Sequence, residues 1–267
     1  MAAATSVPDV AARAARADRG TQRFGTIIVV GGGCYGGYYV RQLARAERAG
    51  ALAWDALIVV DRDAQCAVAK LPAAERPTKL RVELAEWGSF FAAFLGTAAA
   101  DAAQHAHDAI VPSPLMPHLM ADWLVDRARV RWPQRRVATE PLAHPPEVPW
   151  QRAGEDGTHY VSFAEWMCPI NCIEPVRCPH TRGERTWSLP PALQRYALAE
   201  REAGRPFEGP FVFHCAHRAY GVGMLDVRDI LAADVAIRER GARSGAVAFL
   251  VGTTSHCHGA LRRIVLE

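Results

Sequence analysis

The sequence has no long apolar run, no strong excess of charge and no hydrolase signature, and each absence excludes a class of protein. No segment reaches the roughly 18–20 apolar residues that a membrane-spanning helix needs. The net charge is only +3 in 267 residues, without a basic stripe interleaved with aromatic side chains. Neither a Ser–His–Asp arrangement nor a pair of catalytic carboxylates stands out. We therefore expect no membrane span and no nucleic-acid partner.

The N-terminal segment, residues 1–24, lacks the apolar core of an export signal. It is rich in Ala and Arg and includes Asp9 and Asp18, which is a poor match to a transit peptide. We therefore predict a flexible tail and a cytoplasmic protein. The cysteines number seven, and this odd count without an export signal favours reduced thiols and metal ligation over disulfides.

Short apolar runs alternate with helical patterns along most of the chain. Residues 26–33 and 56–61 are β-branched runs typical of buried parallel strands, and residues 35–49 between them have helical spacing. A strand–helix–strand unit of this kind makes its two strands parallel. Further strands are expected at 80–84, 108–114, 135–141, 210–217 and 245–256, and further helices at 90–104, 115–129, 191–202 and 227–241. The pattern predicts an α/β fold with a doubly wound, mostly parallel sheet.

A glycine-rich turn follows the first expected strand. Gly31, Gly33 and Gly36 match G-x-G-x-x-G, directly after a strand and at the start of a helix. The first glycine permits a tight turn, the second lets a pyrophosphate approach the backbone, and the third lets helix and strand pack closely. A carboxylate at Asp61, the end of the second strand, would bond ribose hydroxyls and favour NAD over NADP. Cys34 inside the turn is either a small buried residue or a thiol that faces the cofactor.

Residues 26–61 therefore resemble the Rossmann dinucleotide-binding family, including the NAD-binding domains of the TrkA type. The resemblance implies a Rossmann-like sheet that binds NAD(H), or a related adenine dinucleotide, at Gly31, Gly33, Gly36 and Asp61. It covers a small part of the chain, and its motif is common. The alternative is a glycine turn that binds no nucleotide.

The most unusual segment is WMCPINCIEPVRCPH, residues 166–180, which gathers Cys168, Cys172, Cys178 and His180. Its prolines stiffen the backbone, and thiolate and imidazole groups are ligands of zinc. Cysteines followed directly by proline also occur in iron–sulfur proteins. These residues could hold zinc together, or the cysteines could hold a [4Fe–4S] cluster with a distant fourth ligand. We expect an iron–sulfur cluster, with zinc as the alternative and unligated thiols as the remaining reading.

Two groups of His and Cys follow expected strands further along the chain. In open parallel sheets the ligand crevice lies beyond the carboxyl ends of the strands, so both groups are expected near the glycine turn. His and Cys act as acids, bases, nucleophiles and ligands. Cys215 or Cys257 is also a candidate distant metal ligand. The alternative is buried cysteines beside surface histidines. The first group is His214, Cys215 and His217, the second is His256, Cys257 and His258, and the catalytic candidates are Cys215, His217, His256, Cys257 and His258.

These expectations divide the chain into four regions. They are the tail 1–24, a dinucleotide-binding region 25–140, a Cys/Pro-rich metal-binding insertion 141–210, and a strand–helix–strand region 211–267 that completes the sheet. The leading hypothesis is an NAD-linked oxidoreductase or redox protein with a cysteine-ligated metal site near the cofactor. It would act on a small molecule or with an electron-transfer partner, and its oligomeric state stays open. The alternative is a non-catalytic, TrkA-like nucleotide-sensing module with a structural zinc or a redox-sensing cysteine loop.

Overall fold

The computed structural model describes residues 20–164 and 168–267, which form two mixed sheets. The α/β class predicted from the sequence is confirmed. Parallel and antiparallel strands occur in both sheets, in place of the single, mostly parallel, doubly wound sheet expected from the sequence. Of the tail expected over residues 1–24, residues 1–19 lie outside the described part of the chain, and residues 22–24 already belong to the first strand.

The first sheet has the order β3-β2-β1-β4-β10-β9. The strands β1 to β4 are parallel neighbours, whereas β10 is antiparallel to β4 and to β9. Side chains of β1 alternate between the two faces, so Ile27 and Val29 pack on one side and Ile28 and Val30 on the other. The strands are β1 (Gln22–Val30), β2 (Leu52–Asp61), β3 (Leu80–Leu84), β4 (Ala109–Val111), β9 (Ala216–Ala219) and β10 (Val222–Asp226).

The second sheet has the order β6-β7-β12-β11-β8, and β5 also pairs with β12. Its β8 and β11 are parallel, while β11 and β12 form an antiparallel hairpin. The strands β6 and β7 come from the expected insertion and are part of this sheet. The strands are β5 (Val137–Glu140), β6 (Trp150–Ala153), β7 (His159–Ser162), β8 (Glu208–His214), β11 (Val247–Thr254) and β12 (His258–Leu266).

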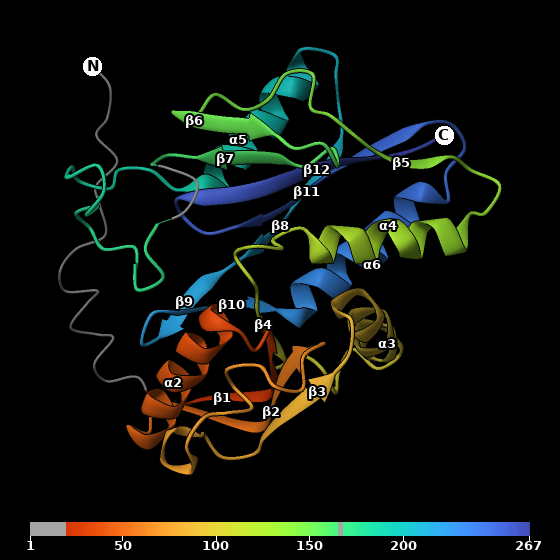
Figure 1. Cartoon of the computed structure of the whole chain (residues 1–267). Coiled ribbons are helices and arrows are strands. Elements are labelled where there is room, and N and C mark those ends of the chain that lie inside the picture. The colour runs from red at the N-terminus through yellow and green to blue at the C-terminus, as the bar shows by residue number, and fades with distance from the viewer. Residues whose placement is uncertain (1–19, 165–167) are drawn as a thin grey trace.

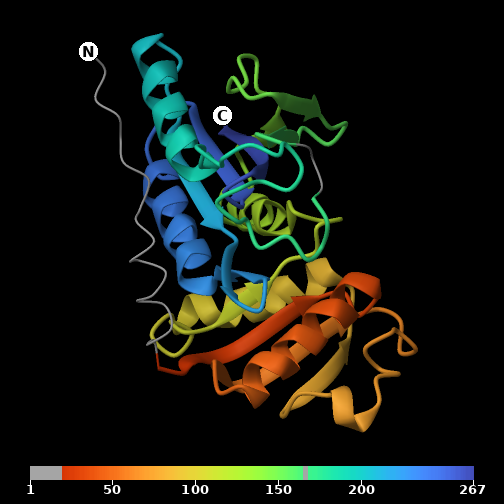
Figure 2. The ribbon, with the colours of Figure 1, turned by 90° about the vertical axis from the view of Figure 1, so that its left-hand side faces the viewer.

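The helices form layers around and between the two sheets. One helix, α2, covers the outer face of the first sheet, and α5 covers the outer face of the second. The apolar faces of α3, α4 and α6 share one core with both sheets. Figure 1 shows α4 and α6 between the sheets, and Figure 2 shows the same stacking after a quarter turn. The helices are α2 (Cys34–Arg48), α3 (Trp87–Ala100), α4 (Leu119–Arg131), α5 (Leu189–Glu202) and α6 (Val227–Gly241), with a short 3-10 helix, η1 (Ala73–Glu75).

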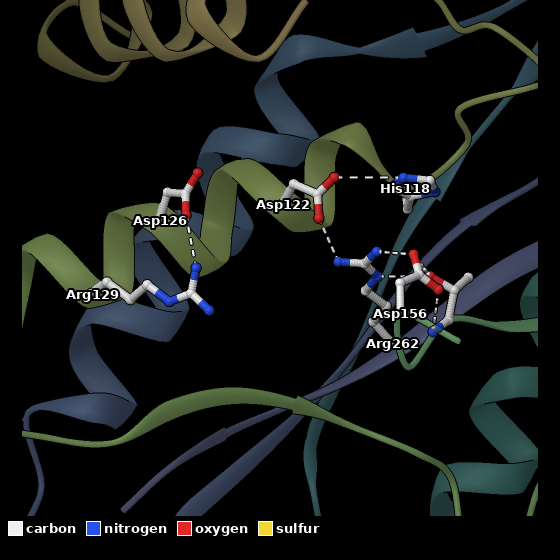
Figure 3. A network of polar contacts seen from close by, with 7 residues as sticks. His118, Asp122, Asp126, Arg129, Asp156 and Arg262 are labelled. Atoms are coloured by element: carbon white, nitrogen blue, oxygen red, sulfur yellow. Dashed lines mark hydrogen bonds and ion pairs between the residues drawn. The ribbon is translucent and has the colours of Figure 1, made fainter. Parts of the chain in front are cut away.

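A buried arginine joins α4 to the second sheet. Arg262 of β12 donates to the Thr158 hydroxyl at 2.8 Å and pairs with Asp156 and Asp122 (Figure 3). His118 lies 3.7 Å from the other side of the Asp122 carboxylate. Each of the three guanidinium nitrogens thus donates a hydrogen bond, and two carboxylates balance the charge, which makes this buried cation tolerable. Within the described residues, no helix combines the length and apolarity required to cross a membrane.

The chain passes from the second sheet to the first directly after β8. This strand ends at His214, and β9 of the first sheet begins at Ala216. Cys215, at the crossing, donates its backbone N–H to the carbonyl oxygen of Thr254 at 2.6 Å. Because β8 and β11 are parallel neighbours, their carboxyl ends meet at this point.

Candidate functional site

A cavity of about 180 Å³ lies at the crossing between the two sheets. One wall is formed by Tyr35 and Tyr39 of α2 and by the proline-rich segment that follows β4. Another part of the wall is formed by Cys168 and Cys172 of the segment that carries Cys168, Cys172 and Cys178, here called the cysteine segment. The start of β9 and the turn from β11 to β12 also line the cavity. Segments that are far apart in the sequence therefore line one space.

The glycine turn has the backbone geometry that its spacing predicts. Gly31 has φ +84°, a left-handed conformation that favours glycine. A Cβ at Gly36 would lie 1.8 Å from the carbonyl oxygen of Gly31, so helix and strand are in close contact there. A Cβ at Gly33 would meet no atom within 4 Å, so the start of α2 is open.

Asp61 holds this glycine turn against β2. Its Oδ2 accepts the backbone N–H of Gly32 at 2.6 Å, and its Oδ1 accepts that of Asp63 at 2.9 Å. The carboxylate therefore has a structural role besides the ribose contact predicted from the sequence. Cys34, the first residue of α2, is exposed rather than buried.

Cys168 and Cys172 lie against each other on the wall of the cavity. The Cys168 thiol hydrogen-bonds to the Cys172 sulfur, which raises the pKa of Cys168 and lowers the pKa of Cys172. The backbone N–H of Cys172 donates to the carbonyl oxygen of Pro169 at 2.8 Å and closes the turn between the two cysteines. The C-x3-C spacing thus produces a thiol pair.

Cys178 opens a tight turn in the same segment. Its backbone N–H donates to the carbonyl oxygen of Gly183 at 2.9 Å, and its buried sulfur accepts the N–H of Thr181 at 3.5 Å. Burial raises the pKa of Cys178, but the hydrogen bonds from Thr181 and from the His180 backbone outweigh it and lower the pKa. The side chain of His180 is exposed on this turn.

Cys257 is buried in the turn between β11 and β12. Its sulfur accepts the indole N–H of Trp187 at 3.3 Å. Its backbone N–H donates to Oε1 of Glu174 at 3.2 Å, which ties the cysteine segment to the second sheet. The Cys168 thiol interacts electrostatically with Cys172, Cys257 and Cys178, so four thiols share this region.

The free thiols do not by themselves form a closed metal site. Over residues 20–164 and 168–267, no set of three or more His, Cys, Asp or Glu side chains could hold a metal ion as placed. All seven cysteines are free, including those of the predicted metal set. The predicted ligands Cys168, Cys172 and Cys178 are thus neighbours rather than a closed coordination shell.

Glu174 is a buried carboxylate that sequence reasoning missed. Its Oε2 lies 3.8 Å from Nδ1 of His217, and its side chain is 8% exposed. Burial raises the pKa of Glu174, but the hydrogen bond from Ser255 and the nearby His217 and His256 outweigh it, so the net shift is downward. The signal in the sequence was a single acidic residue between two cysteines, which looks like an exposed loop residue.

The other predicted catalytic residues surround the same crossing. Cys215, His217 and His258 line the cavity, and burial raises the pKa of the Cys215 thiol to about 12. The ring of His256 contacts that of His214, with 4.6 Å between the two centroids. Burial, with a contribution from His256, lowers the pKa of His214. The two His/Cys groups predicted at strand ends are therefore brought together.

Two residues that line the cavity have buried polar atoms that make no hydrogen bond to any described residue, and one of these atoms, Nδ1 of His217, faces Glu174 at 3.8 Å. Nδ1 of His217 and Oγ1 of Thr254 are buried and have no hydrogen-bond partner within the part of the chain that the structure describes. Both residues line the cavity. Buried polar atoms in native proteins almost always have a partner, so this wall is suited to a bound polar molecule.

Residues 120–267 match the model of a family described as "Uncharacterized protein, C-terminal domain". The matched part contains the cysteine segment, the second sheet and the crossing at Cys215. The glycine turn and the strands β1 to β4 lie before it. No curated protein and no solved structure matches the chain.

Proposed function

Through residues 120–267 the chain belongs to that family, and we propose that it is a nucleotide-linked redox protein. In this proposal NAD(H), or a related adenine dinucleotide, binds at the glycine turn. Its reactive ring lies in the cavity against the thiol group of Cys168 and Cys172. A small molecule or a protein partner exchanges electrons there.

One observation carries the proposal: a single cavity is lined by the start of α2 and by the thiol pair. The start of a helix after a glycine turn is where dinucleotide phosphates bind, because N–H groups and the helix dipole attract the anion. The strand order β3-β2-β1-β4 with all pairs parallel is also that of the nucleotide-binding half of a Rossmann sheet. This order supports the finer Rossmann-like assignment for the first sheet.

The residues around the cavity have separate roles in this proposal. Gly33 leaves room for a pyrophosphate beside α2, and Asp61 fixes the turn while keeping lone pairs for a ribose hydroxyl. His217, with Glu174 behind it at 3.8 Å, takes up or releases the proton that accompanies electron transfer. The tyrosines of α2 separate the bound nucleotide from solvent.

A charge placed at Gly33 tests nucleotide binding without disturbing the fold. Gly33→Asp adds a good N-cap residue in open space, so the stability of α2 is kept or improved. The new carboxylate repels a phosphate, and we expect NADH to bind at least about tenfold more weakly, a loss of about 1.4 kcal/mol. Gly96→Asp is the matched control, since it adds the same charge in open space on α3. Titration calorimetry with NADH measures both variants.

Turnover is tested separately with ferricyanide. Oxidation of NADH to NAD⁺ releases a proton and an electron pair, and two ferricyanide ions accept the electrons. We expect the wild-type protein and Gly96→Asp to catalyse this reaction and Gly33→Asp to be impaired. Binding of NADH without oxidation would instead indicate the nucleotide-sensing module. Equal binding by the Gly33 and Gly96 variants would refute the assignment of the glycine turn.

A further inference from the structure

We propose that Cys168, Cys172, Cys178 and Cys257 together bind a soft-metal centre through four thiolates, either an iron–sulfur cluster or a zinc ion. In this site Cys257 takes the place that the sequence spacing gave to His180. The site deepens the proposed function, and its redox role rests on that proposal. Binding of the metal itself does not depend on the proposed function.

The four thiols come from two segments that the fold holds together. Three lie in the cysteine segment, and the fourth lies in the turn of the β11–β12 hairpin. The thiol of Cys168 hydrogen-bonds to Cys172 and interacts with Cys257 and Cys178, and Cys257 also interacts with Cys172. The backbone N–H of Cys257 donates to Glu174, which anchors the segment beside the hairpin. An all-sulfur donor set is the one that zinc and iron–sulfur clusters share.

Two of the sulfurs already have the hydrogen-bond donors that a thiolate ligand requires. Cys178 accepts the backbone N–H of Thr181 at 3.5 Å within a tight turn, and Cys257 accepts the indole N–H of Trp187 at 3.3 Å. Donors to sulfur stabilise the ligand as an anion and fix its direction toward the metal. An unligated, buried apolar thiol has no need of such partners.

Cys257 suits the fourth position better than His180 does. Cys257 is buried in a turn between two long strands, and its thiol interacts with Cys168 and Cys172. His180 is exposed and lies only two residues after Cys178, and its backbone N–H donates to the Cys178 sulfur. The backbone at His180 thus supports a ligand rather than supplying one.

Metal binding has to draw the thiols together, because within the described ranges no such group could hold an ion as placed. Binding removes the thiol protons, so the hydrogen bond between Cys168 and Cys172 is lost and both sulfurs turn to the metal. Residues 168–188, the described part of the chain before α5, contain no helix and no named strand, so the cysteine segment can follow. The hairpin turn with Cys257 stays in place.

The test compares the full-length wild-type protein with Cys257→Ser, His180→Ala and Cys34→Ser after anaerobic purification. Iron, acid-labile sulfide and zinc are measured, together with the visible spectrum. We expect stoichiometric metal in the wild type, in His180→Ala and in Cys34→Ser, and at least about a tenfold loss of bound metal in Cys257→Ser. Metal retained by Cys257→Ser, or lost from His180→Ala, overturns the proposal. So does a wild-type protein that contains no metal after reconstitution with iron and sulfide or with zinc.

A cobalt titration guards against a Cys257→Ser variant that misfolds during expression. Co²⁺ is added anaerobically to each reduced, folded protein, and the sulfur-to-cobalt charge-transfer band reports the number of thiolate ligands. The band should weaken in Cys257→Ser and stay unchanged in His180→Ala; equal bands in both overturn the assignment. Iron with sulfide supports both the site and the redox function, whereas zinc supports the site and overturns the redox role. NADH binding by Cys257→Ser shows separately whether the nucleotide site has survived.

Discussion

Adjacent glycines in α2 should respond to alanine in opposite directions, and this contrast tests the geometry of the glycine turn. At Gly36 an added Cβ would lie 1.8 Å from the carbonyl oxygen of Gly31 and 2.9 Å from its carbonyl carbon. Both atoms belong to the backbone, so no flexible side chain can move away. At Gly37 the nearest atoms are the end of the Arg41 side chain at 3.6 Å and Cβ of Ala67 at 3.7 Å, which are ordinary contacts.

The magnitudes follow from two opposing effects. Replacing a helical glycine by alanine stabilises a protein by about 1 kcal/mol through chain entropy, and Gly37→Ala should show this gain. Gly36→Ala has the same gain, but overpacking against the backbone costs about 3 kcal/mol, so the net effect is a loss of about 2 kcal/mol. The variants should therefore differ by about 3 kcal/mol in the free energy of unfolding.

Urea denaturation followed by tryptophan fluorescence measures this difference. With an m-value of about 3 kcal/mol/M, the midpoints of the two variants should be separated by about 1 M. The wild-type midpoint should lie between them, and the m-value should stay constant. If Gly36→Ala is as stable as Gly37→Ala, helix α2 does not approach β1 as closely as described, and the structural basis for nucleotide binding fails with it.

Two predictions concern the buried charges that hold the layers together. Arg262→Lys replaces the guanidinium fork with a single ammonium that cannot bond to Thr158, Asp122 and Asp156 together. We expect the free energy of unfolding, measured by thermal denaturation, to fall by about 2 kcal/mol. A decrease below about 0.5 kcal/mol would contradict the network. Asp234→Asn leaves Arg131 and Arg127 without their anion and should cost about 3 kcal/mol at neutral pH. Burial raises the pKa of Asp234, but these arginines outweigh it and hold the pKa below 3.8, so its stabilisation is full above that value and is lost as the pH falls through the folded pKa. An acid titration of stability that is equally steep in Asp234→Asn would show that this carboxylate contributes nothing.

The strands β1 to β4 of the first sheet could be predicted from the sequence, most clearly β1 and β2, which carry an uninterrupted local signal. The runs before Gly31 and up to Asp61 are β-branched and apolar, since both faces of these parallel strands are buried. The glycine spacing then fixed the position of the turn. In this region the apolar, β-branched residues that favour strands are also the residues that the fold buries.

In the second sheet β5, β8 and β11 overlap strands expected from the sequence, whereas β6, β7 and β12 were missed, and β12 was hidden because it carries charge. The strand β12 contains Arg262 and Arg263, and a buried arginine makes a core strand look like a surface segment. Only the fold supplies the partners, Asp122 from α4 and Asp156 from the β6–β7 turn, that make this residue acceptable inside. The sequence did not predict β10 at all, and its antiparallel pairing with β4 leaves no mark on so short a strand.

The candidate site shows the same division between local and tertiary information. The thiols of the cysteine segment were predicted because three cysteines and three prolines in one short segment have no ordinary structural use. Glu174 was not predicted as a site residue, because its role depends on the positions of His217 and Cys257, which are remote in sequence. Sequence spacing also assigned His180 as a ligand simply because it was the nearest donor. In the proposed site Cys257 takes that position, and the Cys257→Ser and His180→Ala variants decide between the two ligands.

The two proposed sites depend on different parts of the chain, and this separates their failures. All four proposed thiolate ligands lie within residues 120–267, the part that defines the family, whereas the glycine turn lies before it. A substitution at Gly33 should therefore leave metal binding unchanged. The cavity, in contrast, is lined by residues from both parts: Tyr35 and Tyr39 of α2, which packs on the first sheet, and Cys168 and Cys172. Electron exchange between nucleotide and metal would then be a property of the crossing at Cys215, where the two sheets share a wall, and of neither part alone.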